Sequence, residues 1–225
     1  MTFSIVGRCA ETGQLGIAIS SSSIAVGARC AWARAGVGAV ATQNVTLPAL
    51  GAQILDPIAN LRLEPADALE RALGADTWRQ YRQVTVIDAQ GRTAFFSGSE
   101  ALGVHCAMAG EQCVAAGNLL AGVGVIEAMV PAFERARGAL ADRLLTAMHA
   151  ALAAGGEAGP VHSAALEIVG DLSWPIVDLR VDWADDDPIG RLDALWQAYR
   201  PQMRDYVTRA LNPTAAPSYG VPGNE

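Results

Sequence analysis

The fold is decided by Thr2-Phe3-Ser4-Ile5-Val6, which directly follows Met1. Phe3 and Ile5 alternate with polar residues, which is typical of a β-strand because successive side chains point to opposite faces. Ala10-Glu11-Thr12-Gly13-Gln14 supplies a turn, and the segment from Leu15 to Ile19 returns as a second strand. The sequence therefore predicts an N-terminal β-hairpin whose first strand begins at a threonine.

The threonine at position 2 has chemical significance because methionine aminopeptidases remove Met when the next residue is small. Without Met1, Thr2 would carry a hydroxyl and a free α-amine. The reference pKa of an α-amine is about 7.7–8.0, so a useful neutral fraction exists near pH 7. One residue would then supply both a nucleophile and a base for acyl transfer. An ordinary frayed strand end is the alternative interpretation.

The composition indicates a compact globular protein and excludes several kinds of chemistry. Hydrophobic residues make up 51% of the 225 residues, charged residues make up 17%, and the net charge is −7. An acidic chain argues against a nucleic-acid partner. All 16 basic residues are arginine, which excludes a Walker A lysine and a Schiff-base lysine.

No feature of the sequence predicts a membrane, a metal or a cofactor. The longest apolar run, Leu119 to Phe133, is too short to span a bilayer. A signal-peptide pattern is also missing, so we expect a cytoplasmic protein with no membrane partner. The cysteines lack the spacing of a metal site, so we expect buried free thiols and no metal; they are Cys9, Cys30, Cys106 and Cys113.

The remaining patterns predict a mixture of strands and helices without regular βαβ alternation. Such an order favours stacked antiparallel sheets with helices outside. Ser20 to Ser23 is either a solvated turn or a row of hydroxyls lining a pocket, and the residues alone favour the turn. We expect one domain over residues 1–211 and a Pro/Gly-rich tail over residues 212–225. The expected strands are 36–43, 84–88, 93–96, 164–169 and 175–183, and the expected helices are 47–61, 65–73, 117–128, 132–153 and 191–211.

Several segments spread over nearly the whole chain resemble the prokaryotic family called Domain of Unknown Function 1028. The most distinctive is Gly36-Val37-Gly38-Ala39-Val40-Ala41-Thr42-Gln43. The resemblance implies an N-terminal-nucleophile (Ntn) hydrolase-like fold of the α+β class. This fold is a four-layer αββα sandwich, in which helices flank two stacked, mainly antiparallel sheets and Thr2 lies at the mouth of the cleft between them. The other matching segments are Thr2 to Val6, Gly117 to Leu120, Gly155-Gly156, Ser163 to Leu166, Asp178 to Asp182 and Asp187-Pro188.

One segment departs from the family. Relatives often carry Gly-Gly-Asp-x-Arg-Gly where this chain has Gly155-Gly156-Glu157-Ala158-Gly159-Pro160. Glu157 keeps the carboxylate but the arginine is missing, so we expect a substrate preference that differs from that of relatives.

The resemblance gives each polar residue near Thr2 an expected role. Ser21 or Ser22 would orient the α-amine, because a short hairpin returns its second strand beside the first. Asn118 and Gln43 would stabilise an oxyanion, although a helix cap and a strand-end hydrogen bond are their alternatives. The expected catalytic residues are Thr2, Ser21, Ser22 and Asn118, and the expected substrate-binding residues are Gly38, Thr42, Gln43 and Glu157.

The leading functional hypothesis is an Ntn-type amidohydrolase that acts on a small amide, without a cofactor, as a homo-oligomer. The alternative is a catalytically inert Ntn-like scaffold that binds a small metabolite or assembles with partners. The missing lysine motivates this alternative, because a decisive base is absent from the side chains. A cysteine enzyme that uses Cys9 or Cys30 has the least support.

Overall fold

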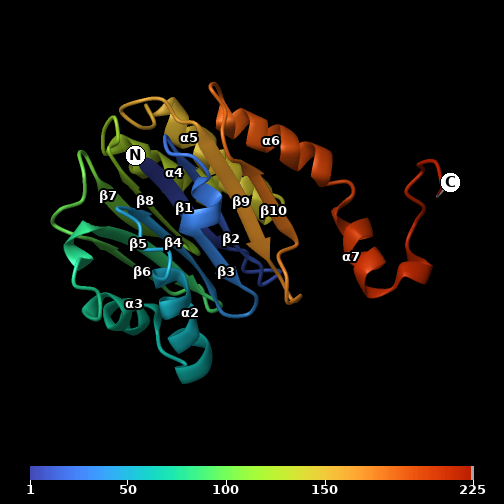
Figure 1. Ribbon diagram of the computed structural model, residues 1–225, viewed down its shortest axis with the longest axis horizontal. Helices are drawn as coiled ribbons and strands as arrows, with labels where there is room; N and C mark the ends of the chain where they lie inside the picture. The colour runs from blue at the N-terminus through green and yellow to red at the C-terminus, as the bar shows by residue number, and fades with distance from the viewer. Residues whose placement is uncertain (224–225) are drawn as a thin grey trace.

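The computed structural model describes residues 1–223 and shows two stacked β-sheets between layers of helices (Figure 1). All strand pairs in both sheets are antiparallel. The six-stranded sheet has the order β10 (Val177–Val181), β9 (Ser163–Val169), β2 (Leu15–Ser21), β1 (Thr2–Arg8), β8 (Cys113–Asn118) and β7 (Cys106–Gly110). The four-stranded sheet has the order β3 (Ala31–Arg34), β4 (Gly38–Asn44), β5 (Arg82–Asp88) and β6 (Thr93–Ser97).

Helices cover the outer face of each sheet. Helices α4 (Gly124–Arg135), α5 (Leu140–Ala153) and α6 (Pro188–Tyr199) pack on the six-stranded sheet. Helices α2 (Leu50–Leu61) and α3 (Pro65–Gly74) pack on the four-stranded sheet. The expected α+β sandwich of four layers is therefore confirmed. The short helix α1 (Val26–Cys30) connects β2 to β3, and one-turn helices occupy Arg79–Tyr81 and Pro213–Ala215.

The last helix, α7 (Met203–Leu211), lies beyond the end of the sheets, toward the C-terminus (Figure 1). None of its residues is buried. Within residues 1–223 no helix is both long enough and apolar enough to span a bilayer.

The expected N-terminal hairpin is confirmed, and both of its faces are buried. Phe3 and Ile5 pack against the helices, whereas Val6 packs in the layer between the sheets. Because side chains alternate along a strand, Thr2 and Ser4 share the face of Val6. The hairpin thus directs the Thr2 side chain between the two sheets, at the first residue of an interior strand.

Four local predictions were wrong. Ser20 and Ser21 continue β2, so the turn begins only at Ser22. The expected helix over 117–128 begins at Gly124, because residues 113–118 form β8. The helix over 132–153 is interrupted at residues 136–139, where Gly138 has a φ of 99°. The helix over 191–211 divides at Pro201, which has no backbone N–H to continue it.

Candidate functional site

The side chains of three predicted site residues meet between the sheets at the start of β1. Thr2 is paired with Ser21 of β2 on one side and with Asn118 of β8 on the other. Directly paired residues direct their side chains to the same face of a sheet. Ser21 and Asn118 are fully buried, and Thr2 is 6% exposed. The hairpin register and the β1–β8 register together produce this cluster from segments far apart in the sequence.

The Thr2 hydroxyl lies in a chain of hydrogen-bonding groups. Thr2 Oγ1 donates to the Met1 carbonyl oxygen at 2.5 Å, and Ser21 Oγ donates to the same oxygen at 2.5 Å. The two hydroxyl oxygens are 3.1 Å apart. Ser23 continues the chain, with its Oγ 2.9 Å from Ser21 Oγ, and Arg29 donates to Ser23 Oγ at 3.0 Å. A carbonyl carried by the first residue is therefore held by two hydroxyls.

A buried network of side-chain amides supports Asn118. Gln83 of β5 accepts hydrogen bonds on its Oε1 from Asn118 Nδ2 at 3.0 Å and from Gln43 Nε2 at 2.8 Å. Ser4 donates to Gln43 Oε1 at 2.8 Å. Gln83 also donates from Nε2 to the Gly117 carbonyl at 3.0 Å. The network joins β1, β4, β5 and β8 and fixes the orientation of the Asn118 amide.

The Asn118 amide retains one hydrogen-bond donor and one acceptor that are not used within the network. Its Oδ1 atom is buried and has no hydrogen-bond partner within residues 1–223. Its Nδ2 carries two hydrogens, and Gln83 takes one of them. Gln43 is bonded within the network through both amide atoms, with its Oε1 bound by Ser4 and its Nε2 donating to Gln83, so it supports the network.

Glu157 lies beside the segment that follows Asn118. The Ala158 N–H donates to the Leu119 carbonyl at 2.9 Å, and Glu157 itself forms an isolated β-bridge with Leu120. The side chain is buried, and within residues 1–223 neither carboxylate oxygen has a hydrogen-bond partner. An unpaired carboxylate away from water is costly.

Burial raises the pKa of Glu157 to about 8, because desolvation disfavours the charged form. The positive charge of the N-terminal ammonium opposes this increase in the pKa. The Ser22 amide and hydroxyl also lie near enough to lower the pKa, although neither satisfies the geometry of a hydrogen bond to the carboxylate. Ser22 is thus associated with Glu157, and the serine beside Thr2 is Ser21.

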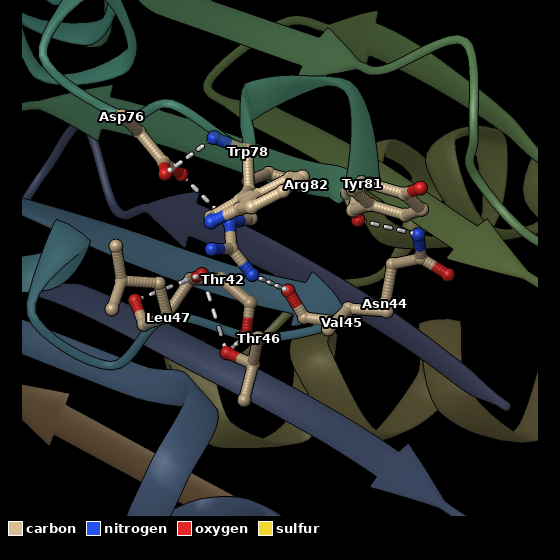
Figure 2. Close-up of polar contacts among 9 residues, drawn as sticks. All are labelled: Thr42, Asn44, Val45, Thr46, Leu47, Asp76, Trp78, Tyr81 and Arg82. Carbon is tan, nitrogen blue, oxygen red and sulfur yellow. Dashed lines mark hydrogen bonds and ion pairs between the residues drawn. The ribbon is translucent and has the colours of Figure 1, made fainter.

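Two predicted site residues lie elsewhere. Thr42 pairs with Val84, which packs against the α2–α3 layer, so Thr42 faces the helices instead of Thr2. Its Oγ1 lies 3.3 Å from Thr46 Oγ1, in the loop shown in Figure 2. Gly38 lies at the opposite end of β4 from Gln43, and a Cβ there would lie 2.6 Å from the Ile87 carbonyl oxygen. Gly38 therefore serves close packing between strands.

Figure 2 also shows how the loop after β4 is fixed. Arg82 forms a buried ion pair with Asp76 at 2.7 Å and donates to the Val45 carbonyl at 2.6 Å. The hydrogen bond from Arg82 lowers the pKa of Asp76. Asn44, with a φ of 74°, donates to the Tyr81 carbonyl at 2.6 Å. These contacts hold the end of β4, and with it Gln43.

The sequence analysis did not identify Gln83, although it is the centre of the network. A signal was present, because Gln83 and Thr85 alternate with Val84 and Val86 at the period of a strand. Two polar residues in phase on a buried strand indicate a polar layer between the sheets.

Cysteines and metal ligands do not contribute to this site. Within residues 1–223, no group of three or more His, Cys, Asp or Glu residues is arranged to hold a metal ion. All four thiols are free. Burial raises the pKa of Cys30 and raises that of Cys113 to about 12, so neither is a ready thiolate.

Comparisons with known proteins identify relatives of unknown function. Residues 2–192 match the family model DUF1028, described as a family of unknown function. The crystal structure of protein SPO2555 from Silicibacter pomeroyi, also assigned to DUF1028, shares 32% identity and a TM-score of 0.85, covering 91% of this chain and 89% of that chain.

More distant similarity extends to structures of Anbu. The Anbu (ancestral beta-subunit) structure from Yersinia bercovieri has 11% identity and a TM-score of 0.42, and the coverage is 90% of this chain and 96% of that chain. Anbu from Hyphomicrobium sp. strain MC1 has 14% identity and a TM-score of 0.41, and the coverage is 89% of this chain and 95% of that chain. No curated protein matches the chain.

Proposed function

The chain belongs to the DUF1028 family, and from this premise we propose that it is an Ntn-type amidohydrolase with Thr2 as its nucleophile. One observation carries the proposal. Thr2 begins an interior strand, and its hydroxyl lies between the sheets with its oxygen 3.1 Å from Ser21 Oγ. The active form in this proposal is the chain without Met1, because only then does Thr2 carry a free α-amine.

The α-amine is the base in this proposal. Side-chain alternatives are poor, since the chain has no lysine and the guanidinium of Arg29 does not deprotonate in proteins. The free amine of Thr2 would be bonded to the same Cα as the side chain that carries the hydroxyl, within reach of its proton. Ser21 Oγ, 3.1 Å from Thr2 Oγ1, would relay that proton or hold the amine in place.

The reaction proceeds in two acyl-transfer steps. The α-amine accepts the Thr2 hydroxyl proton while Oγ1 forms a bond to the carbonyl carbon of the amide. The tetrahedral intermediate then breaks its C–N bond, and the α-ammonium returns the proton to the leaving amine. A water molecule next attacks the Thr2 ester, its proton passes to the α-amine, and the carboxylic acid departs as Oγ1 regains a proton.

Asn118 supplies amide recognition in this proposal. Its second Nδ2 hydrogen is available to stabilise the oxyanion that forms on the substrate carbonyl oxygen. Its unpartnered Oδ1 is available to accept from the N–H of the same substrate amide. A fixed amide side chain that offers one donor and one acceptor is complementary to an amide substrate.

Acylation by a β-lactone tests the proposed function. We expect the lactone to modify Thr2 in the wild-type chain, and we expect no modification of Thr2→Ala. Thr42→Val is a matched control, since Thr42 lies on the opposite face of its sheet and should leave acylation unchanged. If Thr2 is never acylated in the folded protein lacking Met1, the result favours the inert scaffold that binds a small metabolite.

Assembly is a further part of the proposal. Exposed apolar side chains lie on loops near the Thr2 end of the strands, and such a rim suits contact between copies of the chain. We expect a homo-oligomer, which light scattering of the purified protein would detect. The exposed side chains are Ile24, Val45, Leu102, Val104 and Val123, with exposed fractions between 44% and 60%.

A further inference from the structure

Met1 lies against the hydroxyls that the proposed reaction uses. Its carbonyl oxygen accepts hydrogen bonds from Thr2 Oγ1 and Ser21 Oγ. Its side chain reaches Gly159, where a Cβ would lie 2.9 Å from Met1 Cε. Met1 therefore contacts both the hydroxyl cluster and the segment that contains Glu157.

The chemistry of the proposed reaction makes Met1 a useful stand-in. The methionyl group is an acyl group on the Thr2 nitrogen, whereas an acyl-enzyme carries its acyl group on Thr2 Oγ1. The nitrogen and Oγ1 of one threonine are separated by two carbon atoms, so both acyl positions lie on one five-membered ring. The surroundings of the methionyl group thus indicate which acyl groups the site accepts.

The methionyl group also carries an ammonium, and Glu157 is a buried acid close enough to be influenced by its charge. The positive charge of that ammonium acts to lower the pKa of the Glu157 carboxyl. Within residues 1–223 neither an arginine nor the Met1 ammonium forms an ion pair with Glu157, so the carboxyl group has no cationic partner. Arg29, on the nearby hydroxyl chain, donates instead to Ser23 and to the Ile24 carbonyl.

Glu157 is buried, has no partner for its side chain within residues 1–223 and lies on a fixed segment of backbone, as expected of a group that binds a ligand. Its side chain is buried and both oxygens lack a hydrogen-bond partner within the described part of the chain. Backbone contacts to Leu119 and Leu120, directly after Asn118, fix the segment that carries it. A buried unpaired carboxylate is stabilised when a cationic donor arrives, because charge-assisted hydrogen bonds are the strong ones.

We propose that Glu157 determines specificity by pairing with the free α-ammonium of the substrate, whose class is therefore the amides of α-amino acids. This inference rests on the proposed function of Thr2. Gly159 leaves room for an unbranched side chain of the kind that Met1 places there. Amides whose amino group is blocked bring no cation to Glu157 and would bind less tightly.

Protection against β-lactone acylation tests this inference with two matched probes, L-methioninamide and N-acetyl-L-methioninamide. The probes differ at the amino group, which is cationic only in the first. In the wild-type chain lacking Met1, methioninamide should protect Thr2 at a concentration about ten-fold lower than the acetylated probe. In Glu157→Gln the two probes should protect within about two-fold of each other, because the carboxylate charge is gone.

Glu167→Gln is the control variant. Glu167 lies on β9 and also has a raised pKa, of about 7, chiefly through burial, but it pairs with Ile17 in the adjoining strand, away from Thr2. This variant should keep the preference for the free amine. Because each preference is a ratio measured on one variant, partial loss of folded protein does not alter it.

The possible outcomes separate this inference from the proposed function. Acylation of Thr2 with equal protection by the two probes would overturn the inference and leave the nucleophile in place. The inference would also be overturned if Glu157→Gln still prefers methioninamide to the acetylated probe. It would equally be overturned if Glu157→Gln only slows acylation, because Glu157 would then act on the α-amine of Thr2 and not on the substrate. A chain lacking Met1 in which Thr2 is not acylated would overturn both.

Discussion

Thr2 and Asn118 lie directly opposite one another, as the first residue of β1 and the last residue of β8, with their side chains in the same layer between the sheets. Gln83 reaches this pair from the opposing sheet and fixes the Asn118 amide at 3.0 Å. The Thr2 hydroxyl therefore lies beside an Asn118 amide that has a free donor and a free acceptor and is held in place by Gln83.

Replacing Asn118 tests its role beside the nucleophile. We expect Asn118→Ala to slow acylation of Thr2 by about 10²–10³-fold, the usual cost of removing one oxyanion donor. The measurement is the rate of β-lactone adduct formation by mass spectrometry. Asn60→Ala, on the exposed side of α2, is the control and should react at the wild-type rate. An unchanged rate in Asn118→Ala would remove Asn118 from the mechanism.

Two adjacent serines provide a matched pair, because they lie on opposite faces of β2. Ser21→Ala should slow acylation about ten-fold, since it removes a hydrogen bond of ordinary strength from the Thr2 hydroxyl. Ser20 instead donates to the Ser163 carbonyl at 3.0 Å. Ser20→Ala should lower the free energy of unfolding by about 1 kcal/mol and leave the rate unchanged. Equal rates in the two variants would argue against a relay through Ser21.

The amide network should contribute strongly to stability. Gln83→Leu leaves hydrogen-bond donors of Gln43 and Asn118 without their acceptor, so we expect the free energy of unfolding to fall by about 3 kcal/mol. Urea denaturation measures this change. Gln53→Leu, on the exposed side of α2, is the control and should change stability by less than about 0.5 kcal/mol. A Gln83→Leu protein as stable as the wild type would show that the network does not hold the sheets together.

Glu157 should make stability depend on pH. Its pKa rises from the ordinary value of 4.5 to about 8 on folding, so the folded state keeps a proton that the unfolded state releases. The stabilisation is complete below pH 4.5 and is lost as the pH rises to about 8. The slope is at most about 1.4 kcal/mol per pH unit.

Glu157→Gln removes this contribution because its side chain does not titrate. Unfolding free energies measured across the same pH range should therefore show the variant gaining on the wild type as the pH rises, with a constant difference above about pH 8. Glu167, whose pKa is also raised by burial, is present in both proteins and cancels from the difference. Parallel pH profiles of the two proteins would place Glu157 in a solvated position.

Local patterning predicted much of the fold, but failed where long-range packing decides. The β1–β2 hairpin was predictable because apolar and polar residues alternate along it. Strand β8 was missed because Ala115, Ala116 and Gly117 are small residues with little β-propensity, and the helix expected over 117–128 included the last two residues of the strand. Small residues are required there, since a Cβ on Gly117 would lie 2.7 Å from Leu120 Cδ2.

The same contrast holds for the candidate site. Ser21 could be placed beside Thr2 because a hairpin fixes the register of its two strands. The family resemblance, and not a local pattern, suggested Asn118. Gln83 approaches from the other sheet, and no local period encodes such a contact. Thr42 has the polarity of a site residue, but alternation along β4 directs it to the helices, whereas Gln43 lies in the layer between the sheets.

The most direct test of the central claim is the mass of the N-terminal peptide from native protein, before and after treatment with the β-lactone. We expect a chain that begins at Thr2 and carries the adduct on that residue. A chain that retains Met1, and in which Thr2 stays unmodified, would contradict it.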